Sequence, residues 1–226
     1  MKTIGILGGL GPESTLEYYR YITRTYYQRY ADYAYPEVVI YSLSFQKFIE
    51  AGYDLPGEVK AAIEKLHRAG ADFVVASCNS VHLVYDRVAG EVPIPWVSIM
   101  DATAEQITAR GLTKVGLLGT IFTMGQGFYQ QALARHGIET VTPGPEAQSK
   151  VNEIIFAELV RAEIKEASRR FVLDCIEDLG RNGAQGIVLG CTELPFLIKQ
   201  AHTALPVFDT TTIHAQKALD LALEGN

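Results

Sequence analysis

Two cysteines of this chain share the same local setting. Cys78 ends the segment GADFVVASC (70–78), and Cys191 ends the segment GAQGIVLGC (183–191), 113 residues further along. Both segments begin with Gly-Ala, continue through an apolar run and stop at a thiol that polar residues follow. Two thiols in equivalent places can act on opposite faces of one carbon: a thiolate removes a proton and the other thiol returns one. Such a pair would invert a stereocentre without a cofactor.

A buried cysteine is more often a small apolar packing residue than a reagent. Cys175 fits that structural interpretation because its predicted helix, 168–181, surrounds it with apolar neighbours. For Cys78 and Cys191, the duplicated position and the polar residues after them favour a chemical role. A free thiol has a pKa of about 8.5, which falls near the N-terminus of a helix. Because a helix is predicted just after each of the two cysteines, thiolate formation is expected there.

Short apolar runs alternate along the chain with amphipathic segments. Strands are predicted at 3–7, 38–41, 73–76, 96–99, 114–118, 186–189 and 206–208. Helices are predicted at 59–69, 102–110, 128–135, 150–161, 168–181 and 213–223, together with a first helix whose start is a capping box formed by Ser14 and Glu17 behind Pro12. Alternation of this kind predicts an α/β fold with mainly parallel sheets.

The repeat extends beyond the cysteines and divides the chain. Residues 3–9 align with 114–120, and the Ile-Pro-Trp-Val of 94–97 resembles the Leu-Pro-Val-Phe of 205–208, at nearly the same offset. We therefore expect two pseudo-symmetric α/β domains, each a mainly parallel sheet flanked by helices: 1–100 plus 211–226, and 101–210. Ligands of open parallel sheets bind beyond the carboxyl ends of the strands. The active site is expected in a cleft between the domains, lined by both cysteines.

Composition excludes several classes of protein. The 226 residues are 48% apolar and 20% charged, with a net charge of -6 and no basic run, which disfavours nucleic acid and anionic membranes as partners. No apolar stretch is long enough for a transmembrane helix, and the start MKTIGILGGLG fits a first strand better than a signal peptide. Three cysteines without a CxxC pattern argue against disulfides and zinc, so a reducing cytoplasmic location and no metal are expected. The GGLG stretch lacks the spacing of a nucleotide-binding loop.

Several short motifs together resemble those of one enzyme family. They are Gly8-Gly9, Glu13-Ser14-Thr15, Tyr18-Tyr19-Arg20, Cys78-Asn79-Ser80 and Gly190-Cys191-Thr192-Glu193. This set resembles the aspartate/glutamate racemase family, and is closest to its aspartate racemase branch. The glutamate racemases of cell-wall synthesis usually begin with Asp-Ser-Gly and carry Gly-Cys-Thr-His, where this chain has Gly-Cys-Thr-Glu. The resemblance implies a racemase of an acidic amino acid that uses two cysteines, needs no cofactor and commonly forms a homodimer.

The resemblance also assigns roles to individual residues. Cys78 and Cys191 match the two catalytic bases. The residues that flank the cysteines, Asn79, Ser80 and Thr192, match positions that hold the substrate's α-carboxylate and amine. We add Glu193, the last residue of the Gly190-Cys191-Thr192-Glu193 motif, as a further substrate-binding residue. Two anion-binding turns are implied, one with Gly9 and Leu10 and its counterpart with Thr120 and Thr123.

The partner of the substrate's distal carboxylate is left open. Lys47 stands where some aspartate racemases use an arginine, but a lysine lacks the planar fork of a guanidinium. Lys150 and Arg161 are further candidates. Aspartate is therefore the first expectation for the substrate, and glutamate or another amino acid stays open.

Other functions and roles remain as alternatives. A related isomerase or decarboxylase of a small dicarboxylate would use the cysteines differently, and a two-lobed metabolite-binding protein would not need them. A redox pair would require Cα atoms within about 7 Å. The tyrosines of the first helix are interpreted as core or dimer surface, His82 as a hydrogen-bonded structural residue and His214 as a cap contact.

Overall fold

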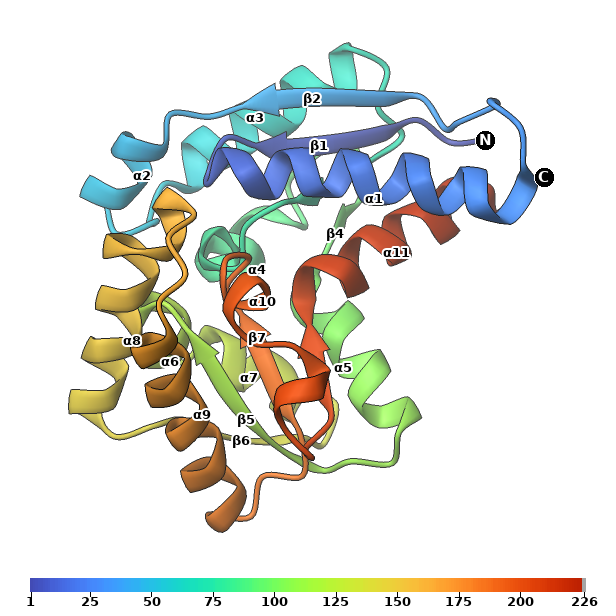
Figure 1. The fold of residues 1–226 in the computed structure, drawn as a ribbon. Helices are drawn as coiled ribbons and strands as arrows, with labels where there is room; N and C mark the ends of the chain where they lie inside the picture. The colour runs from blue at the N-terminus through green and yellow to red at the C-terminus, as the bar shows by residue number, and fades with distance from the viewer. Residues whose placement is uncertain (225–226) are drawn as a thin grey trace. The chain divides into compact units, whose positions relative to one another are not determined.

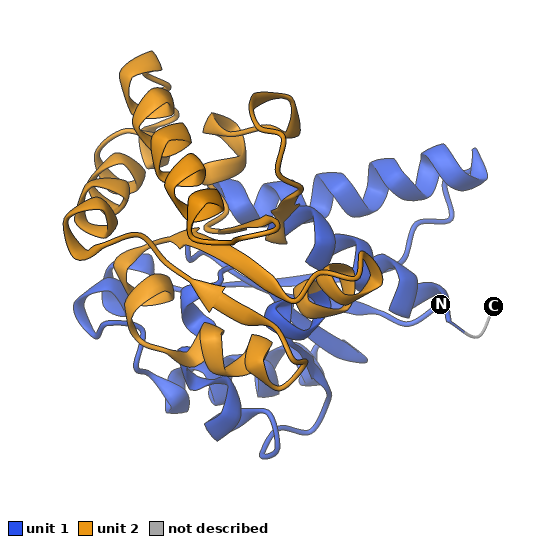
Figure 2. Cartoon of the chain, turned by 90° about the horizontal axis from the view of Figure 1, so that it is seen from below, with its two compact units in different colours: residues 1–102, 211–226 blue, residues 103–210 orange. Residues whose placement is uncertain are grey.

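The computed structural model describes residues 1–224 and contains two compact units. The first unit comprises residues 1–102 together with the C-terminal segment from Thr211, and the second comprises residues 103–210 (Figure 2). The division predicted from the repeat falls at 100/101 and 210/211, and the observed units divide at 102/103 and 210/211.

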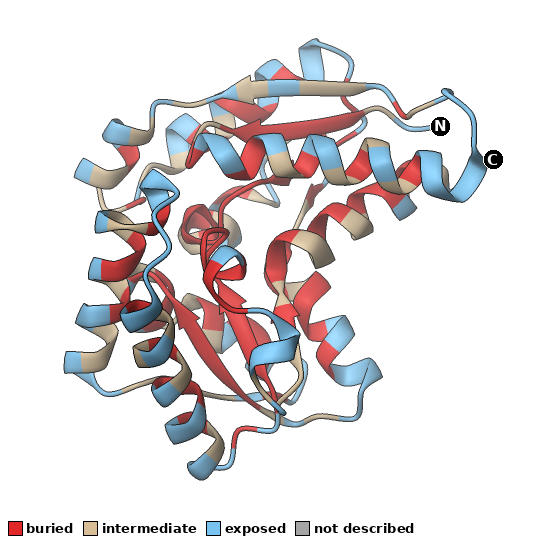
Figure 3. Ribbon diagram, in the orientation of Figure 1, coloured by how far each residue is buried: buried red, intermediate tan, exposed pale blue. Residues whose placement is uncertain are grey.

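The first unit is built on a parallel sheet with the order β2-β1-β3-β4. The strands are β1 (Ile4–Gly8), β2 (Val38–Ser42), β3 (Phe73–Ala76) and β4 (Trp96–Val97). Its helices are α1 (Pro12–Tyr30), α2 (Phe45–Glu50), α3 (Pro56–Arg68), η1 (Ser80–Val84), α4 (Tyr85–Val88) and α11 (Thr210–Leu223), drawn in Figure 1. The two central strands, β1 and β3, are buried along their whole length. The edge strand β2 is partly exposed, and Figure 3 shows the contrast between β1 and β2.

One apolar core holds the helices α1 and α11 against this sheet. Ile4 and Ile6 of β1 pack with Ile22 of α1 and with Ala215 and Leu219 of α11 in a single buried cluster. Alternate residues of a strand face opposite sides of the sheet, so Ile4 and Ile6 point to the same side. The last helix of the chain is thereby part of the first unit.

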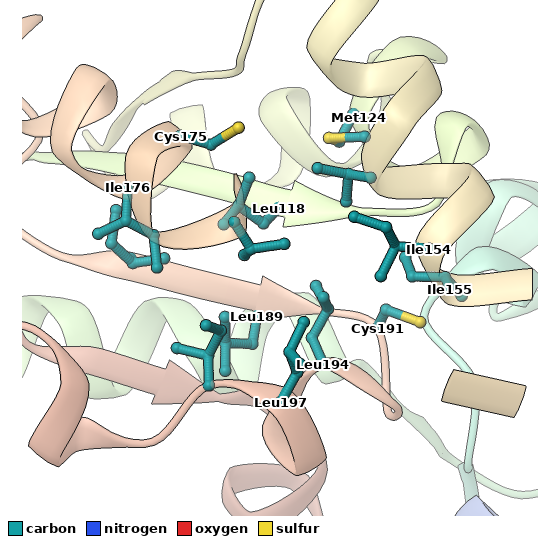
Figure 4. Packing of buried hydrophobic residues seen from close by; sticks show 14 of the residues in the cluster. Leu118, Met124, Ile154, Ile155, Cys175, Ile176, Leu189, Cys191, Leu194 and Leu197 are labelled. Carbon is teal, nitrogen blue, oxygen red and sulfur yellow. The ribbon is translucent and has the colours of Figure 1, made fainter. Parts of the chain in front are cut away.

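The second unit repeats this arrangement with the order β6-β5-β7-β8, again all parallel. The strands are β5 (Lys114–Gly119), β6 (Glu139–Val141), β7 (Ile187–Gly190) and β8 (Val207–Asp209). Its helices are α6 (Ile121–Gly125), α7 (Phe128–Ala134), α8 (Pro145–Ala157), η2 (Leu159–Arg161), α9 (Glu166–Arg181), α10 (Leu194–Leu197) and η3 (Gln200–His202), while α5 (Ile99–Ala109) leads from the first unit into the second. The core of this unit includes Leu118, Leu189 and Ile176 (Figure 4).

The predicted fold class is confirmed, and several predicted boundaries are wrong. The strand β6 was not predicted, because it has only three partly exposed residues and pairs on one side only. The first helix begins at Pro12, whose fixed φ suits a first helical position, so Ser14 lies inside the helix and the N-cap residue is Gly11. Ile99 opens α5 instead of ending a strand, and the helix predicted at 150–161 is α8, which starts at Pro145 and ends before η2.

Within residues 1–224, no helix is both long and apolar enough to cross a membrane. The same residues contain no group of three or more histidine, cysteine or acidic side chains that could hold a metal ion.

Candidate active site

In the first unit, Cys78 lies in a buried turn at the carboxyl end of β3. Its side chain is only 7% exposed, and the neighbouring side chains Ser77, Asn79 and Ser80 are buried too. The helical segment that follows, η1, starts at Ser80 and has five residues. The predicted helix after Cys78 therefore exists, but it is a short 3-10 turn whose end carries less charge than that of a full α-helix.

The turn after β1 is joined to the segment that carries Cys78. The backbone N–H of Gly9 donates a hydrogen bond to Thr15 Oγ1 (3.0 Å), and this hydroxyl is also hydrogen-bonded to Ser77 Oγ (3.2 Å). Leu10 of the same turn is buried. Sequence reasoning missed Thr15 and Ser77 as connecting residues, although each is a small hydroxyl residue beside a strand end. The predicted anion-binding turn and the first cysteine thus lie at one edge of the sheet.

A substitution of Gly9 is expected to disturb this turn strongly. Gly9 has a φ of 83°, and a Cβ added to it would lie 2.4 Å from Ser42 Oγ and 2.5 Å from Leu43 O. Gly9→Ala should therefore lower the free energy of unfolding by about 2–4 kcal/mol, from left-handed strain plus a clash with backbone. Urea denaturation followed by circular dichroism measures the change.

Gly70→Ala is the matched control, because Gly70 also has a positive φ (99°) but no heavy atom within 4 Å of an added Cβ. Strain alone should cost about 1–2 kcal/mol there. Equal destabilisation by the two substitutions would contradict the close packing of the Gly9 turn.

In the second unit, the thiol of Cys191 is hydrogen-bonded to a carboxylate. Cys191 follows β7, and its Sγ donates to Glu193 Oε2 over 2.9 Å. The hydroxyl of Thr192 donates to the same oxygen over 2.8 Å. The three side chains are buried, with exposures of 6%, 9% and 8% for Cys191, Thr192 and Glu193. A sulfur and a carboxylate oxygen this close must share a proton, because two bare anions would repel each other.

This thiol lies at the margin of the apolar core. In Figure 4 the sulfur of Cys191 is directed away from Leu189 and Leu194. Cys175, by contrast, belongs to α9, and burial, reinforced by Asp178 and Asp174, raises the pKa of its thiol to about 11. Cys175 therefore stays protonated at neutral pH, in line with the structural role expected for it.

The turn after β5 corresponds to the Gly9 turn of the first unit. Thr120 caps α6, and the N–H of Thr123 donates to its hydroxyl (3.3 Å), while the two hydroxyl oxygens are 3.2 Å apart. This turn packs on the strand that carries Cys191: a Cβ added to Gly190 would lie 3.0 Å from Thr123 Cγ2. The two predicted threonines thus lie beside the strand end that carries Cys191.

The three predicted cationic residues lie at the surface of their units. Lys47 of α2 forms an ion pair with Glu58 (2.6 Å), and both side chains are about half exposed. Lys150 of α8 pairs with Glu153 (3.0 Å), and Arg161 is an exposed residue of η2. Exposed pairs of this kind are weak, about 0–1 kcal/mol, so Lys47 and Lys150 could each exchange the paired glutamate for another carboxylate. Their predicted contact with substrate stays a prediction.

Comparison with known proteins identifies the family of this chain. A family model described as Asp/Glu/Hydantoin racemase matches residues 7–218. The chain belongs to the Asp/Glu/hydantoin racemase family. The resemblance inferred from the short motifs is thereby confirmed.

Individual members of the racemase family match over almost the whole chain. The broad specificity amino-acid racemase RacX of Bacillus subtilis is 26% identical, over 97% of this chain and 98% of its own length. The crystal structure of an aspartate racemase homologue from Pyrococcus horikoshii is 42% identical and superposes with a TM-score of 0.88, covering 99% of this chain and all of the other. An aspartate racemase of Picrophilus torridus, 23% identical, shares the fold with a TM-score of 0.77, covering 98% of this chain and 94% of that one.

Proposed function

We propose that this member of the racemase family interconverts the L and D forms of an acidic amino acid by proton transfer between Cys78 and Cys191. The observation that carries the proposal is the placement of the two thiols. Each lies at the carboxyl end of the third strand in sheet order, in sheets of the same topology. Ligands of parallel sheets bind at that edge.

The reaction we propose runs in two proton transfers. One cysteine, as thiolate, takes the α-hydrogen as a proton, and the electron pair of the broken C–H bond is delocalised into the α-carboxylate. The other cysteine, as thiol, then donates its proton to the opposite face of the α-carbon. The two thiols end with their protonation states exchanged, and no net proton is gained or lost. Neither a metal nor pyridoxal phosphate takes part.

The substrate's polar groups would be held by residues beside the two sulfurs. We assign the α-carboxylate and amine to Asn79, Ser80 and Thr192, which flank the cysteines. The turns with Gly9 and Leu10 and with Thr120 and Thr123 would offer backbone amides and hydroxyls to an anionic group. These assignments follow the racemase motifs and are supported by the position of both turns beside the cysteine strands.

Glu193 receives a more specific role in this proposal. Its carboxylate accepts hydrogen bonds from both Cys191 and Thr192. We propose that it acts as the proton partner of Cys191, and that a direct contact with the substrate's amine, first expected from its motif, is the alternative. The residue two positions after Cys78 is a hydroxyl residue, Ser80, so the two thiols would be activated differently.

The experiment that tests the function is an exchange assay without added pyridoxal phosphate. The L and D forms of aspartate, glutamate and a panel of uncharged amino acids are incubated with the enzyme in D₂O, and inversion and loss of the α-hydrogen are measured by chiral chromatography and NMR. We expect both with an acidic amino acid, at equal kcat/KM in the two directions because enantiomers have equal free energies. No inversion and no exchange with any member of the panel would reject the proposal.

The same panel tests Lys47 as the partner of the distal carboxylate. Lys47→Met should reduce kcat/KM for aspartate or glutamate about tenfold and leave uncharged substrates unaffected, because only the acids would lose an ion pair. An equal effect on all substrates would remove Lys47 from the site and leave Lys150 and Arg161 as candidates.

Two other functions give different results in this assay. An isomerase or decarboxylase of a small dicarboxylate would leave amino acids unchanged and convert the dicarboxylate instead. A metabolite-binding protein would bind its ligand equally well after both cysteines were replaced by alanine. The homodimer that the family resemblance implies is a separate proposal, measured by the molar mass in solution.

A further inference from the structure

Two buried histidines of the first unit, His82 and His214, have no role in the reaction as proposed. His82 belongs to η1 and His214 to α11, and their side chains are 1% and 0% exposed. Their ring centroids are 6.0 Å apart. Fully buried histidines are uncommon, so the contacts of both rings call for an explanation.

The hydrogen bonds assign one tautomer to His82. The backbone N–H of Ile99 donates to His82 Nε2 (3.2 Å), so this nitrogen carries no proton. The proton must therefore be on Nδ1, which donates to the backbone carbonyl of Cys78 (2.9 Å). His82 thus connects the cysteine turn with the first residue of α5.

The same reasoning assigns the tautomer of His214. Its Nε2 lies 3.1 Å from the carbonyl oxygen of Val97, which can only accept, so Nε2 carries the proton. Its Nδ1 then accepts from the hydroxyl of Tyr18 (2.8 Å). Both rings use one donor and one acceptor, and both are neutral. Burial lowers the pKa of His82 to about 4 and, together with the neighbouring His82, that of His214 to about 3.

Aromatic neighbours fix the orientation of the His82 ring. Tyr85 stacks on it at 5.9 Å and Trp96 lies against it at 5.1 Å, both measured between centroids. Trp96 is the only tryptophan of the 226 residues. The ring therefore cannot turn to a second hydrogen-bonding position without displacing a buried aromatic side chain.

We propose that His82 is a positioning residue for Cys78, held in one neutral tautomer by its hydrogen bonds to Ile99 and Cys78, and that the buried pair it forms with His214 must stay unprotonated for Cys78 to be presented to substrate. The inference rests on the function proposed above and adds a residue, His82, that positions one of the two thiols, Cys78. A proton added at His82 Nε2 would point at the Ile99 N–H and remove its acceptor. Protonating both rings would place two cations 6.0 Å apart in the core.

Within residues 1–224, titratable and polar groups face His82 from several elements. They are His214 of α11, Tyr18 of α1 through His214, Tyr85 of α4, the Cys78 turn itself, and Asp101 of α5, whose negative charge favours protonation of His82. Burial outweighs that attraction, so the net effect is a lowered pKa.

The test compares two substitutions of His82 with an exposed control. Gln can keep both hydrogen bonds but cannot take up a proton, whereas Leu keeps neither. We expect His82→Gln to retain kcat within about threefold and His82→Leu to lose at least about tenfold in kcat with little change in KM. His67→Gln, at an exposed position of α3, should resemble the wild type.

A second readout does not depend on turnover. The extent of iodoacetamide labelling of Cys78 and of Cys191 is measured on the peptides that contain them. Cys191 lies in the second unit, so its labelling serves as an internal reference. His82→Leu should change the Cys78 to Cys191 labelling ratio at least about fivefold, and His82→Gln should leave it within twofold. A wild-type ratio in a folded His82→Leu variant would overturn the proposal even if the enzyme racemises no amino acid.

A third readout keeps the proposal testable if His82→Leu does not fold. Trp96 fluorescence is followed on acidification, since a protonated histidine quenches an adjacent indole. If the wild type stays folded, its emission should fall with a midpoint near pH 4, the pKa of His82. If it unfolds instead, stability should be lost as the pH falls from about 6.5 towards 4, because the unfolded chain takes up the proton of His82 more readily in that range. His82→Gln should move this transition to lower pH and His67→Gln should not. A transition unchanged in His82→Gln would overturn the proposal.

Discussion

Replacing either Cys78 or Cys191 by alanine should lower racemisation at least about a thousandfold. A positioned general acid or base contributes about 10²- to 10⁴-fold, and inversion needs one group on each face of the α-carbon. A single remaining thiol cannot complete the reaction, so each substitution alone should approach the effect of the double one. Chiral chromatography of aspartate and glutamate measures the rates.

The serine variants separate the proposed two-base reaction from other uses of the thiols. In Cys78→Ser, the thiolate of Cys191 can still remove an α-hydrogen from one enantiomer and return a solvent-derived proton to the same face. In Cys191→Ser, the opposite enantiomer should exchange its α-hydrogen. NMR in D₂O should therefore show exchange without inversion, for one enantiomer in each variant.

Cys175→Ala is the control for the loss of a thiol. Cys175 is buried in the core of the second unit, and its pKa of about 11 keeps it protonated. Its replacement should leave kcat within about twofold and cost at most about 1 kcal/mol of stability. Exchange of both enantiomers in both serine variants would contradict the assignment of one thiol to each face.

Replacing Glu193 by glutamine should reduce kcat about a hundredfold while changing KM less than about threefold. The carboxylate lies 2.9 Å from Cys191 Sγ and can take up the sulfur's proton and return it. A glutamine side chain has the same size and can still accept a hydrogen bond through its amide oxygen, but it cannot take up a proton. The change therefore removes proton affinity and leaves the packing of the buried turn in place.

The split between kcat and KM decides between the two roles of Glu193. If its carboxylate binds the substrate's amine instead, KM should rise at least about tenfold and kcat should change little. Glu146→Gln, an exposed substitution in the first turn of α8, controls for the loss of one negative charge from the unit. A variant Glu193→Gln with wild-type kcat and KM would exclude both roles.

The local pattern of the sequence determined much of the architecture. Apolar runs indicated seven of the eight strands found in residues 1–224, because the core strands are buried on both faces. The repeat between 70–78 and 183–191 indicated two sheets of one kind, and the structure gives both the order 2-1-3-4. Cys78 and Cys191 were singled out for the same reason, since a residue just after a strand can be placed from the strand alone.

The partners of those residues were decided only by the tertiary structure. The sequence ranked Glu193 with the residues flanking the cysteines, but the folded turn directs its carboxylate to Cys191. Lys47 looked available for a substrate, and α2 brings it to Glu58. Such contacts depend on side-chain direction as well as on spacing.

The contact between His82 and His214 was likewise not predictable from the sequence. His82 and His214 are 132 positions apart, and no local pattern connects them. They meet because α11 packs back on the first sheet, where the carbonyl group of Cys78, after β3, accepts from His82 and that of Val97, in β4, accepts from His214. Periodicity specifies which face of an element is buried, but only the packed core determines which polar groups meet there.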